Sequence, residues 1–370
     1  MAVKEDDLVI VRPEGLYCPQ GDFHIDPWRG VARAVITHAH GDHARTGSQH
    51  YWGASRGLGL LRERLGKQSP ITPLDYGQKL RFNEVTISLH SAGHVLGSAQ
   101  VRIEHDDGRV WGVSGDFKRD ADASCDPFEP FRCDTWITEA TFALPIYRWT
   151  DTAEVAAEIS AWWQACKQDG QAAVLFCYSL GKAQRVLAEL AALAASPSDA
   201  ASKPSPDETV YVHGAMPGLI KTYRQAGIQM LPTDAVGNQP KGTSFAGKLV
   251  LAPPGASGTP WMKRLHPYST GFASGWMRVR GGKRRLTYDR GFVMSDHADW
   301  DSLLRTIDDT GAKRVLVTHG HGDALIAHLR ERGIEAAMLA TSFVGESGAA
   351  DDLETDGGAL SDAVEMPSSD

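Results

Sequence analysis

The chain has 370 residues, five cysteines and a formal net charge of −8, and its length allows two domains. It has no run of about 18 apolar residues, so we expect no membrane span, and its N-terminal segment lacks the apolar stretch of a secretory signal. The cysteines are scattered without a Cys-x-x-Cys pair, which argues against a disulfide scaffold or a cysteine zinc site. These features predict a cytoplasmic protein without membrane contact.

The charge is distributed unevenly. Residues 346–370 contain eight acidic residues and no Lys or Arg, so residues 1–345 are neutral overall. We expect this acidic tail to be disordered. Residues 261–290, the basic segment, contain eight Lys or Arg and one acidic residue, which favours a nucleic-acid partner despite the negative total.

Residues 1–145 predict short strands that run into polar turns. The β-branched run at 33–37 leads into a His-rich loop, and the alternating residues 85–89 lead to His94. Predicted strands at 109–113 and 135–138 lead to Asp116 and Glu139 in the same way.

From residue 151 the pattern changes to alternating helices and strands, which predicts an α/β unit with a parallel sheet. Asp151 and Glu154 form a capping box for a helix that ends at Gly170. The remaining elements are a strand at 172–178, a helix at 182–195, a loop at 196–208, a strand at 209–212, a helix at 217–225 and a strand at 248–252. Further strands at 291–294 and 314–318 precede His297 and His319.

The loop after residue 37 contains four metal-binding side chains within six residues: His38, His40, Asp42 and His43. Imidazole nitrogens and carboxylate oxygens bind zinc and similar ions. Four ligands this close together fit two ions more easily than one, because adjacent side chains point apart. The loop therefore predicts a site for two divalent metal ions, zinc or manganese.

Five other polar residues follow apolar strands at their carboxyl ends: His94, Asp116, Glu139, His297 and His319. Strand ends at one edge of a sheet converge, so residues distant in sequence can build one site. We expect these five to join the loop.

The ordered motifs HxHxDH (38–43), AGHVLGSA (92–99) and SGD (114–116) resemble those of the metallo-β-lactamase fold. Glu139 in ITEATF, His297 in SDHAD and His319 in VTHG resemble further motifs of the β-CASP nucleases. Residues 15–45 and the segment SGWMRVRGGKRR (274–285) look more specifically like the bacterial DNA-ligase-associated exonucleases. The resemblance covers residues 8–345.

This resemblance implies an αββα sandwich of the metallo-β-lactamase type, formed by residues 1–149 and 291–345. An inserted β-CASP α/β domain with a parallel sheet would occupy residues 150–290, and the acidic tail 346–370 would follow.

The resemblance also implies a role for each motif residue. One metal would be held by His38, His40 and His94, and the other by Asp42, His43 and His319, with Asp116 bridging the two. Asp26 would orient ligands from outside. A metal-bound hydroxide would attack phosphorus, and His297, oriented by Glu139, would be the general acid; Asp42, Glu139 and His297 are the expected catalytic residues.

Two further groups are candidates for phosphate contacts. Ser179, Lys182 and Arg185 surround a predicted strand–helix turn whose backbone N–H groups can hold an anion, although an ordinary polar turn has the same pattern. Ser274, followed by Gly275, is a further candidate of this kind. The second group lies in the basic segment and would follow the nucleic-acid backbone: Arg278, Arg280, Lys283, Arg284 and Arg285.

The favoured function is a metal-dependent DNA exonuclease, directed to 5′ ends and acting in repair with a DNA ligase and a repair helicase. The first alternative is an RNA-processing β-CASP ribonuclease, endo- or exonucleolytic. Members of the RNA-processing group carry His where His319 stands, whereas DNA-repair members usually carry Val. A small-molecule metallo-hydrolase would have no use for the inserted domain and the Arg cluster, and a catalytically inactive scaffold would typically lose the ligands that are intact here.

Overall fold

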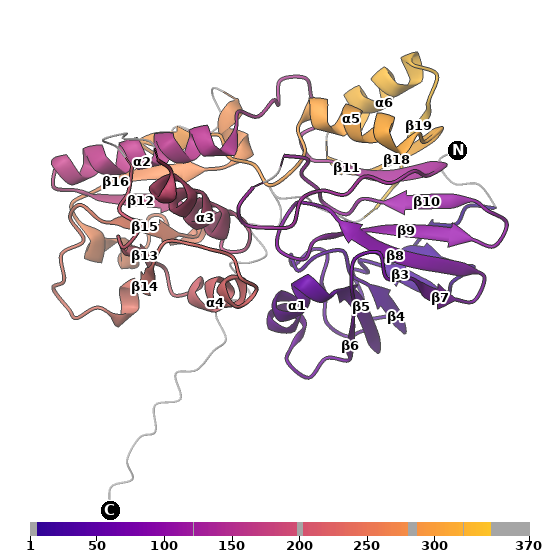
Figure 1. Ribbon diagram of the computed structural model, residues 1–370, viewed down its shortest axis with the longest axis horizontal. Helices are drawn as coiled ribbons and strands as arrows, with labels where there is room; N and C mark the ends of the chain where they lie inside the picture. The colour runs from indigo at the N-terminus through magenta and orange to yellow at the C-terminus, as the bar shows by residue number, and fades with distance from the viewer. Residues whose placement is uncertain (1–5, 121, 198–202, 280–286, 321, 342–370) are drawn as a thin grey trace, which may run out of the picture.

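The computed structural model describes residues 6–120, 122–197, 203–279, 287–320 and 322–341, without the side chain of His319. Several predictions fall outside the described residues. These are the disorder of the tail 346–370 and the phosphate contacts of Arg280, Lys283, Arg284 and Arg285. In Figure 1 the described chain forms a part with two sheets, on the right, and a part with a third sheet, on the left.

The first sheet has the strand order β1-β2-β3-β4-β5-β6. Its strands are β1 (Ile10–Arg12), β2 (Gly15–Cys18), β3 (Phe23–Ile25), β4 (Arg33–Val35), β5 (His50–Ala54) and β6 (Ile71–Leu74). The second sheet has the order β19-β18-β11-β10-β9-β8-β7. Its strands are β7 (Leu80–Phe82), β8 (Val85–Ser91), β9 (Ala99–His105), β10 (Val110–Val113), β11 (Thr135–Ala140), β18 (Arg314–Gly320) and β19 (Glu335–Met338).

These two sheets pack face to face between outer helices. Side chains alternate between the faces of a strand, so Ile137 of β11 joins the core between the sheets. Its neighbour Trp136 packs on the opposite face with residues of α5 (Trp300–Thr310) and α6 (Gly322–Glu331). Helix α1 (Leu58–Leu65) covers the outer face of the first sheet. The layers are therefore helix, sheet, sheet, helix.

The third sheet is entirely parallel, with the order β14-β13-β15-β12-β16-β17. Its strands are β12 (Ala172–Phe176), β13 (Val210–Val212), β14 (Thr233–Ala235), β15 (Leu249–Ala252), β16 (Tyr268–Ala273) and β17 (Arg290–Phe292). The helices are α2 (Thr152–Gln168), α3 (Lys182–Ala195) and α4 (Pro217–Gln225). The α/β class and the parallel sheet are confirmed, and α3 and α4 have the predicted bounds.

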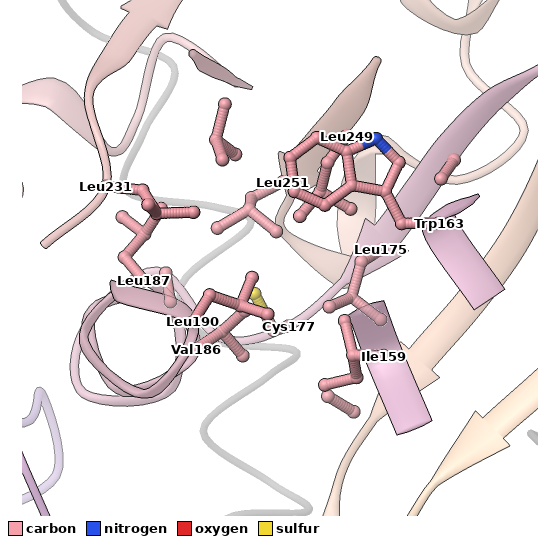
Figure 2. Packing of buried hydrophobic residues seen from close by; sticks show 14 of the residues in the cluster. Ile159, Trp163, Leu175, Cys177, Val186, Leu187, Leu190, Leu231, Leu249 and Leu251 are labelled. Atoms are coloured by element: carbon pink, nitrogen blue, oxygen red, sulfur yellow. The ribbon is translucent and has the colours of Figure 1, made fainter. Parts of the chain in front are cut away.

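Local sequence explains how α2 begins and which face it buries. The Asp151 side chain accepts a hydrogen bond from the backbone N–H of Ala153, which satisfies one of the unpaired donors of the first turn. Both Trp162 and Trp163 are buried. Figure 2 shows Trp163 beside leucines of the strands, in the same buried cluster as leucines of α3. Replacing such a buried Trp with Ala costs about 3–5 kcal/mol, so this core fixes α2 and α3 on one face of the sheet.

The five cysteines are free thiols, as expected without a disulfide scaffold. Among the helices that the structure describes, none combines the length and the apolar character needed to cross a lipid bilayer.

Candidate metal centre

The predicted site residues come together from the ends of strands in all three sheets. His38 follows β4 of the first sheet, whereas His94 and Asp116 follow β8 and β10 of the second, and Glu139 lies within β11. Strands β10, β11 and β18 are parallel, and β8 runs in the same direction because β9 is antiparallel to both β8 and β10. Their carboxyl ends therefore meet at one edge. His297 differs, since it follows β17 of the third sheet.

Four ligand atoms form the first group, from His38, His40, His94 and Asp116, all within 4.8 Å of one another. Nδ1 of His40 lies 3.1 Å from Nε2 of both His38 and His94. Oδ2 of Asp116 lies 3.5 Å from Nε2 of His38 and 3.8 Å from that of His94. Two nitrogens, each about 2.1 Å from one tetrahedral zinc ion, would lie about 3.4 Å apart. The group therefore fits the donor set and spacing of a zinc-type ion.

The other ring nitrogens of this group bind protein atoms that orient them. Nδ1 of His38 lies 3.0 Å from Oγ1 of Thr37, and Nδ1 of His94 lies 2.8 Å from the backbone oxygen of Asp296. Since a carbonyl oxygen only accepts, Nδ1 of His94 carries the proton and Nε2 carries the lone pair. Such contacts fix the tautomer and the direction of a metal-binding imidazole.

The second part of the cluster is built around His43. Its Nε2 lies 3.5 Å from Oδ2 of Asp116 and 3.7 Å from Oδ2 of Asp42, so the same oxygen of Asp116 is close to His43 and to His38 and His94 of the first group. Its Nδ1 lies 2.8 Å from Oδ2 of Asp26. These contacts place Asp42 and His43, the ligands expected from the sequence for a second ion, next to Asp116. The side chain of His319, the remaining predicted ligand, lies outside the described residues.

Asp26 contacts both ends of the loop 37–43, which carries His38, His40, Asp42 and His43. Its carboxylate accepts bonds from the backbone N–H of Thr37 at 2.7 Å and from the Thr37 hydroxyl at 2.5 Å, besides contacting His43. Its backbone is left-handed, with φ of 44°, a conformation that costs free energy in most residues and that Asp tolerates better than most. The predicted orienting role of Asp26 is consistent with these contacts.

The electrostatics of the cluster favour a cation. Burial lowers the pKa of His38, His40 and His94, so these rings are neutral at pH 7 and can offer lone pairs. Burial also acts to lower the pKa of His43, but the carboxylates of Asp116 and Asp42 outweigh it and hold that pKa well above its usual value. The negative charges of Asp116 and Asp42, which favour a proton on His43, would also favour a metal ion beside it.

Glu139 and His297 form a buried pair beside the metal ligands. Nδ1 of His297 lies 2.8 Å from Oε2 of Glu139, while Oε1 of Glu139 accepts the backbone N–H of Phe117 at 2.8 Å. The two residues form a further potential ligand group with Asp116, whose Oδ2 is 4.0 Å from Nδ1 of His297. The pair can move a proton next to the metal cluster, or it can supply ligands.

Glycines of the motifs allow the strand ends to approach closely. At Gly97 (φ +73°) a Cβ would collide with the backbone of Gly57 at the start of α1, and at Gly115 (φ +56°) it would meet the side chain of Thr37 at 2.7 Å. Both positions have the left-handed backbone that glycine adopts most readily. Only glycine lets the turns after His94 and before Asp116 sit against the neighbouring segments.

The structure corrects part of the phosphate-binding prediction. Lys182 and Arg185 are 0% and 1% exposed, and their charges are paired with Asp296 and Asp122 of this chain. Ser274 is also buried, and its hydroxyl accepts the N–H of Trp276. These three side chains are committed to the protein itself. Ser179 is partly exposed and Arg278 is exposed, so both can reach a ligand.

Sequence reasoning overlooked three residues that hold the site. Thr37 and Asp296 contact His38 and His94, two of the candidate metal ligands, and Asp122 pairs with Arg185. The position of Thr37 beside His38, and of Asp296 beside His297, was the available signal. Asp122 carried none, because its partner lies 63 residues further along the chain.

Two similarities to known proteins bear on this chain. The chain is 31% identical over 323 residues to a protein of Opitutus terrae named Probable DNA ligase, a match covering 87% of this chain. The chain thus spans only 30% of the length of that relative. It also resembles a protein of unknown function from Enterococcus faecalis, with a TM-score of 0.52, 11% identity, and coverage of 83% of this chain and 78% of the other. The second likeness shows a shared fold alone. No protein-family model matches.

Proposed function

We propose that this protein is a metal-dependent nuclease of the metallo-β-lactamase fold, in which the segment expected at 150–290 is inserted as a β-CASP domain. Strand β17 extends the sheet of that domain to Phe292, so the flanking parts are 1–149 and the residues from 293 to 345. The layer order of helix, sheet, sheet, helix and the separate parallel sheet support this assignment. The observation that carries it is the convergence of the ligand atoms of His38, His40, His94 and Asp116 within 4.8 Å.

Two zinc or manganese ions would be held by this group and by Asp42, His43 and His319, with Asp116 shared. When bound, such ions neutralise the charge of a phosphodiester and acidify water, which is the chemistry that hydrolysis of the backbone requires. The chain's contribution is to orient the ligands through Thr37, Asp26 and the backbone of Asp296.

His297 is the proposed general acid. Glu139 holds its Nδ1 at 2.8 Å, so Nε2 would carry the proton that passes to the departing oxygen of the substrate. A carboxylate partner stabilises the charged imidazole and fixes its tautomer. Burial of both side chains excludes water from the pair and strengthens their interaction.

The proposed substrate is DNA, cleaved exonucleolytically from 5′ ends during repair beside a ligase. The resemblance to a protein named Probable DNA ligase over most of this chain supports the connection. The matched part is only 30% of that relative. In that relative it is therefore covalently joined to the remainder of a chain that is named a ligase, which would keep the two activities together. The basic segment 261–290 would supply the backbone contacts.

End-labelled single- and double-stranded DNA and RNA, incubated with the purified chain and either zinc or manganese, test this proposal. We expect DNA to be shortened progressively from the 5′ end, and we expect chelator to abolish the activity. Cleavage of RNA alone would replace DNA by RNA as the substrate, and no cleavage of either would refute the nuclease assignment.

Two variants provide the control. His40→Ala removes a ligand atom from the centre of the cluster and should abolish cleavage. His50→Ala removes a histidine that contacts Thr72 in the first sheet, outside the cluster, and should keep it. Equal activity in both variants would show that cleavage comes from a contaminating nuclease.

A further inference from the structure

Two buried cations of α3 form an ion group with two carboxylates. Nζ of Lys182 lies 2.9 Å from Oδ2 of Asp296. The guanidinium of Arg185 contacts Oδ1 of Asp296 and lies 2.6 Å from Oδ2 of Asp122. All four side chains are at most 2% exposed. Two positive and two negative charges balance, as burial requires.

Arg185 also holds two backbone segments of the metal centre. It donates to the carbonyl oxygen of His94 at 3.0 Å and to that of Ser295 at 2.9 Å. A guanidinium presents five N–H donors in a fixed plane, so one side chain can hold several oxygens in one arrangement. Arg185 therefore fixes the turn that carries a metal ligand against the turn that precedes His297.

The contact continues to the ring of His94 through Asp296. The carboxylate of Asp296 is held by Lys182 and Arg185, and its backbone oxygen accepts Nδ1–H of His94 at 2.8 Å. That bond leaves the lone pair of His94 on Nε2, which lies 3.1 Å from Nδ1 of His40. Arg185 thus acts on both the backbone and the ring of the same ligand.

We propose that Arg185, supported by Lys182, is a positioning residue that sets the tautomer and direction of His94 and thereby the metal affinity of the group formed with His38, His40 and Asp116. The inference rests on the proposed metal binding and adds to it a dependence on α3. The alternative is that the ion group only anchors α3 to the two-sheet part.

Arg314 offers a matched control. It is another buried arginine, 7% exposed, whose guanidinium pairs with Asp7 and Glu335. It begins β18, at the end of the strand opposite His319. Arg185→Met and Arg314→Met each remove one buried guanidinium and should both lower the free energy of unfolding. Only Arg185→Met should alter the metal centre.

Zinc titration of the metal-free full chain against a competing chelator gives the first readout. We expect Arg185→Met to bind zinc at least tenfold more weakly than the wild type, in the range found for residues that orient metal ligands. Arg314→Met should stay within about twofold. Arg185→Lys keeps the charge but offers no planar fork, so it should give a smaller loss in the same direction.

The second readout is the tautomer of His94 in the metal-free protein, from ¹⁵N–¹H spectra of histidine side chains. The wild type should show His94 protonated on Nδ1, and the Arg185 variants should show a mixture. Should Arg185→Met fail to fold, Arg185→Lys decides by the same criteria.

Wild-type zinc affinity or a wild-type His94 tautomer in the folded variant overturns the proposal. An equal loss of zinc affinity in Arg314→Met also overturns it, because the effect would then follow stability alone. Failure of the wild type to bind zinc would count against the proposed function, whereas the tautomer would still decide whether Arg185 positions His94.

Discussion

Nδ1 of His297 lies 2.8 Å from Oε2 of Glu139, although the two residues are 158 positions apart in sequence. Glu139 lies in β11 of the second sheet, whereas His297 follows β17 of the third. The contact spans the junction between the parallel sheet and the two-sheet part. A proton-transfer group placed there depends on both parts being assembled, so a fragment of the chain should not reproduce it.

The first prediction concerns this pair. His297→Ala should retain metal but lose about 10²–10⁴-fold in turnover, because the departing oxygen would lose its proton donor. Glu139→Gln should lose less, since the imidazole stays while its orientation and charge are less well supported. Turnover and zinc content of the purified variants check this. Loss of metal from His297→Ala would instead identify His297 as a ligand, an arrangement that its place beside Asp116 and Glu139 permits.

The second prediction concerns Asp26, which contacts Thr37 and His43 but is not an expected ligand. Asp26→Ala should weaken metal binding about 10–100-fold, because Nδ1 of His43 would lose the partner that orients it. It should also destabilise the protein, since the backbone N–H of Thr37 would lose its buried acceptor. Chelator competition and urea unfolding measure the two effects. Asp22→Ala is a control, because Asp22 also has a left-handed backbone but contacts Tyr17 and Arg33 instead.

Sequence patterns predicted helices and strands well where nearby side chains determine the local backbone structure. Helices α3 and α4 have the predicted bounds, and Pro217 stands at the first turn of α4, where proline is favoured. Strand β16, Tyr268–Ala273, was not predicted, because its Ser, Thr and Gly residues give no alternation and its place in the sheet comes from neighbours on both sides. Local propensity is a weak guide for such strands.

The cluster of candidate metal ligands was predictable, because histidine and aspartate are themselves the residue types that bind metals. The ion group of Lys182 and Arg185 with Asp122 and Asp296 was not predictable. Lys182 and Arg185 look like phosphate ligands until their counter-charges are known, and Asp122 and Asp296 lie far away in sequence. Convergence at the edge of one sheet explains only part of how the site forms, because His38 and His297 follow strands of other sheets than His94 does. Pairing across sheets depends on packing that no short pattern encodes.

The third prediction concerns metal removal. The candidate ligands, three of them buried and His40 partly exposed, converge only in the folded chain, so metal binding should stabilise the native state alone. Zinc at about 1,000 times its dissociation constant should add about 4 kcal/mol to the free energy of unfolding. Thermal melts with zinc, manganese or chelator measure the shift, and His40→Ala should remove most of it. A melting temperature independent of metal in the wild type would contradict a structural contribution of the ions.

The fourth prediction concerns Arg278, an exposed residue of the basic segment. Arg278→Glu should weaken binding of all DNA sequences about equally and reduce the salt dependence of binding, because a phosphate contact carries no sequence information. Binding isotherms at several salt concentrations check this. Lys79→Glu reverses an exposed charge just before β7 and should leave binding unchanged. A loss confined to one sequence context would assign Arg278 to base recognition.

The last prediction concerns the approach of Gly97 to Gly57. Gly97→Ala should lower the free energy of unfolding by about 2 kcal/mol or more, since its Cβ would collide with backbone that cannot rotate away. Gly77→Ala separates this clash from backbone strain, because Gly77 has a similar φ of +75° but nothing within 4 Å of its Cβ position. The Gly77→Ala substitution should cost about 1 kcal/mol.

The same clash should reach the metal centre. Gly97 lies three residues after His94, and the Ser98 hydroxyl accepts the His94 backbone N–H. Displacement of this turn should therefore also weaken zinc binding in Gly97→Ala and not in Gly77→Ala. Equal losses of stability in the two variants would show that the close contact with α1 contributes nothing beyond the backbone conformation.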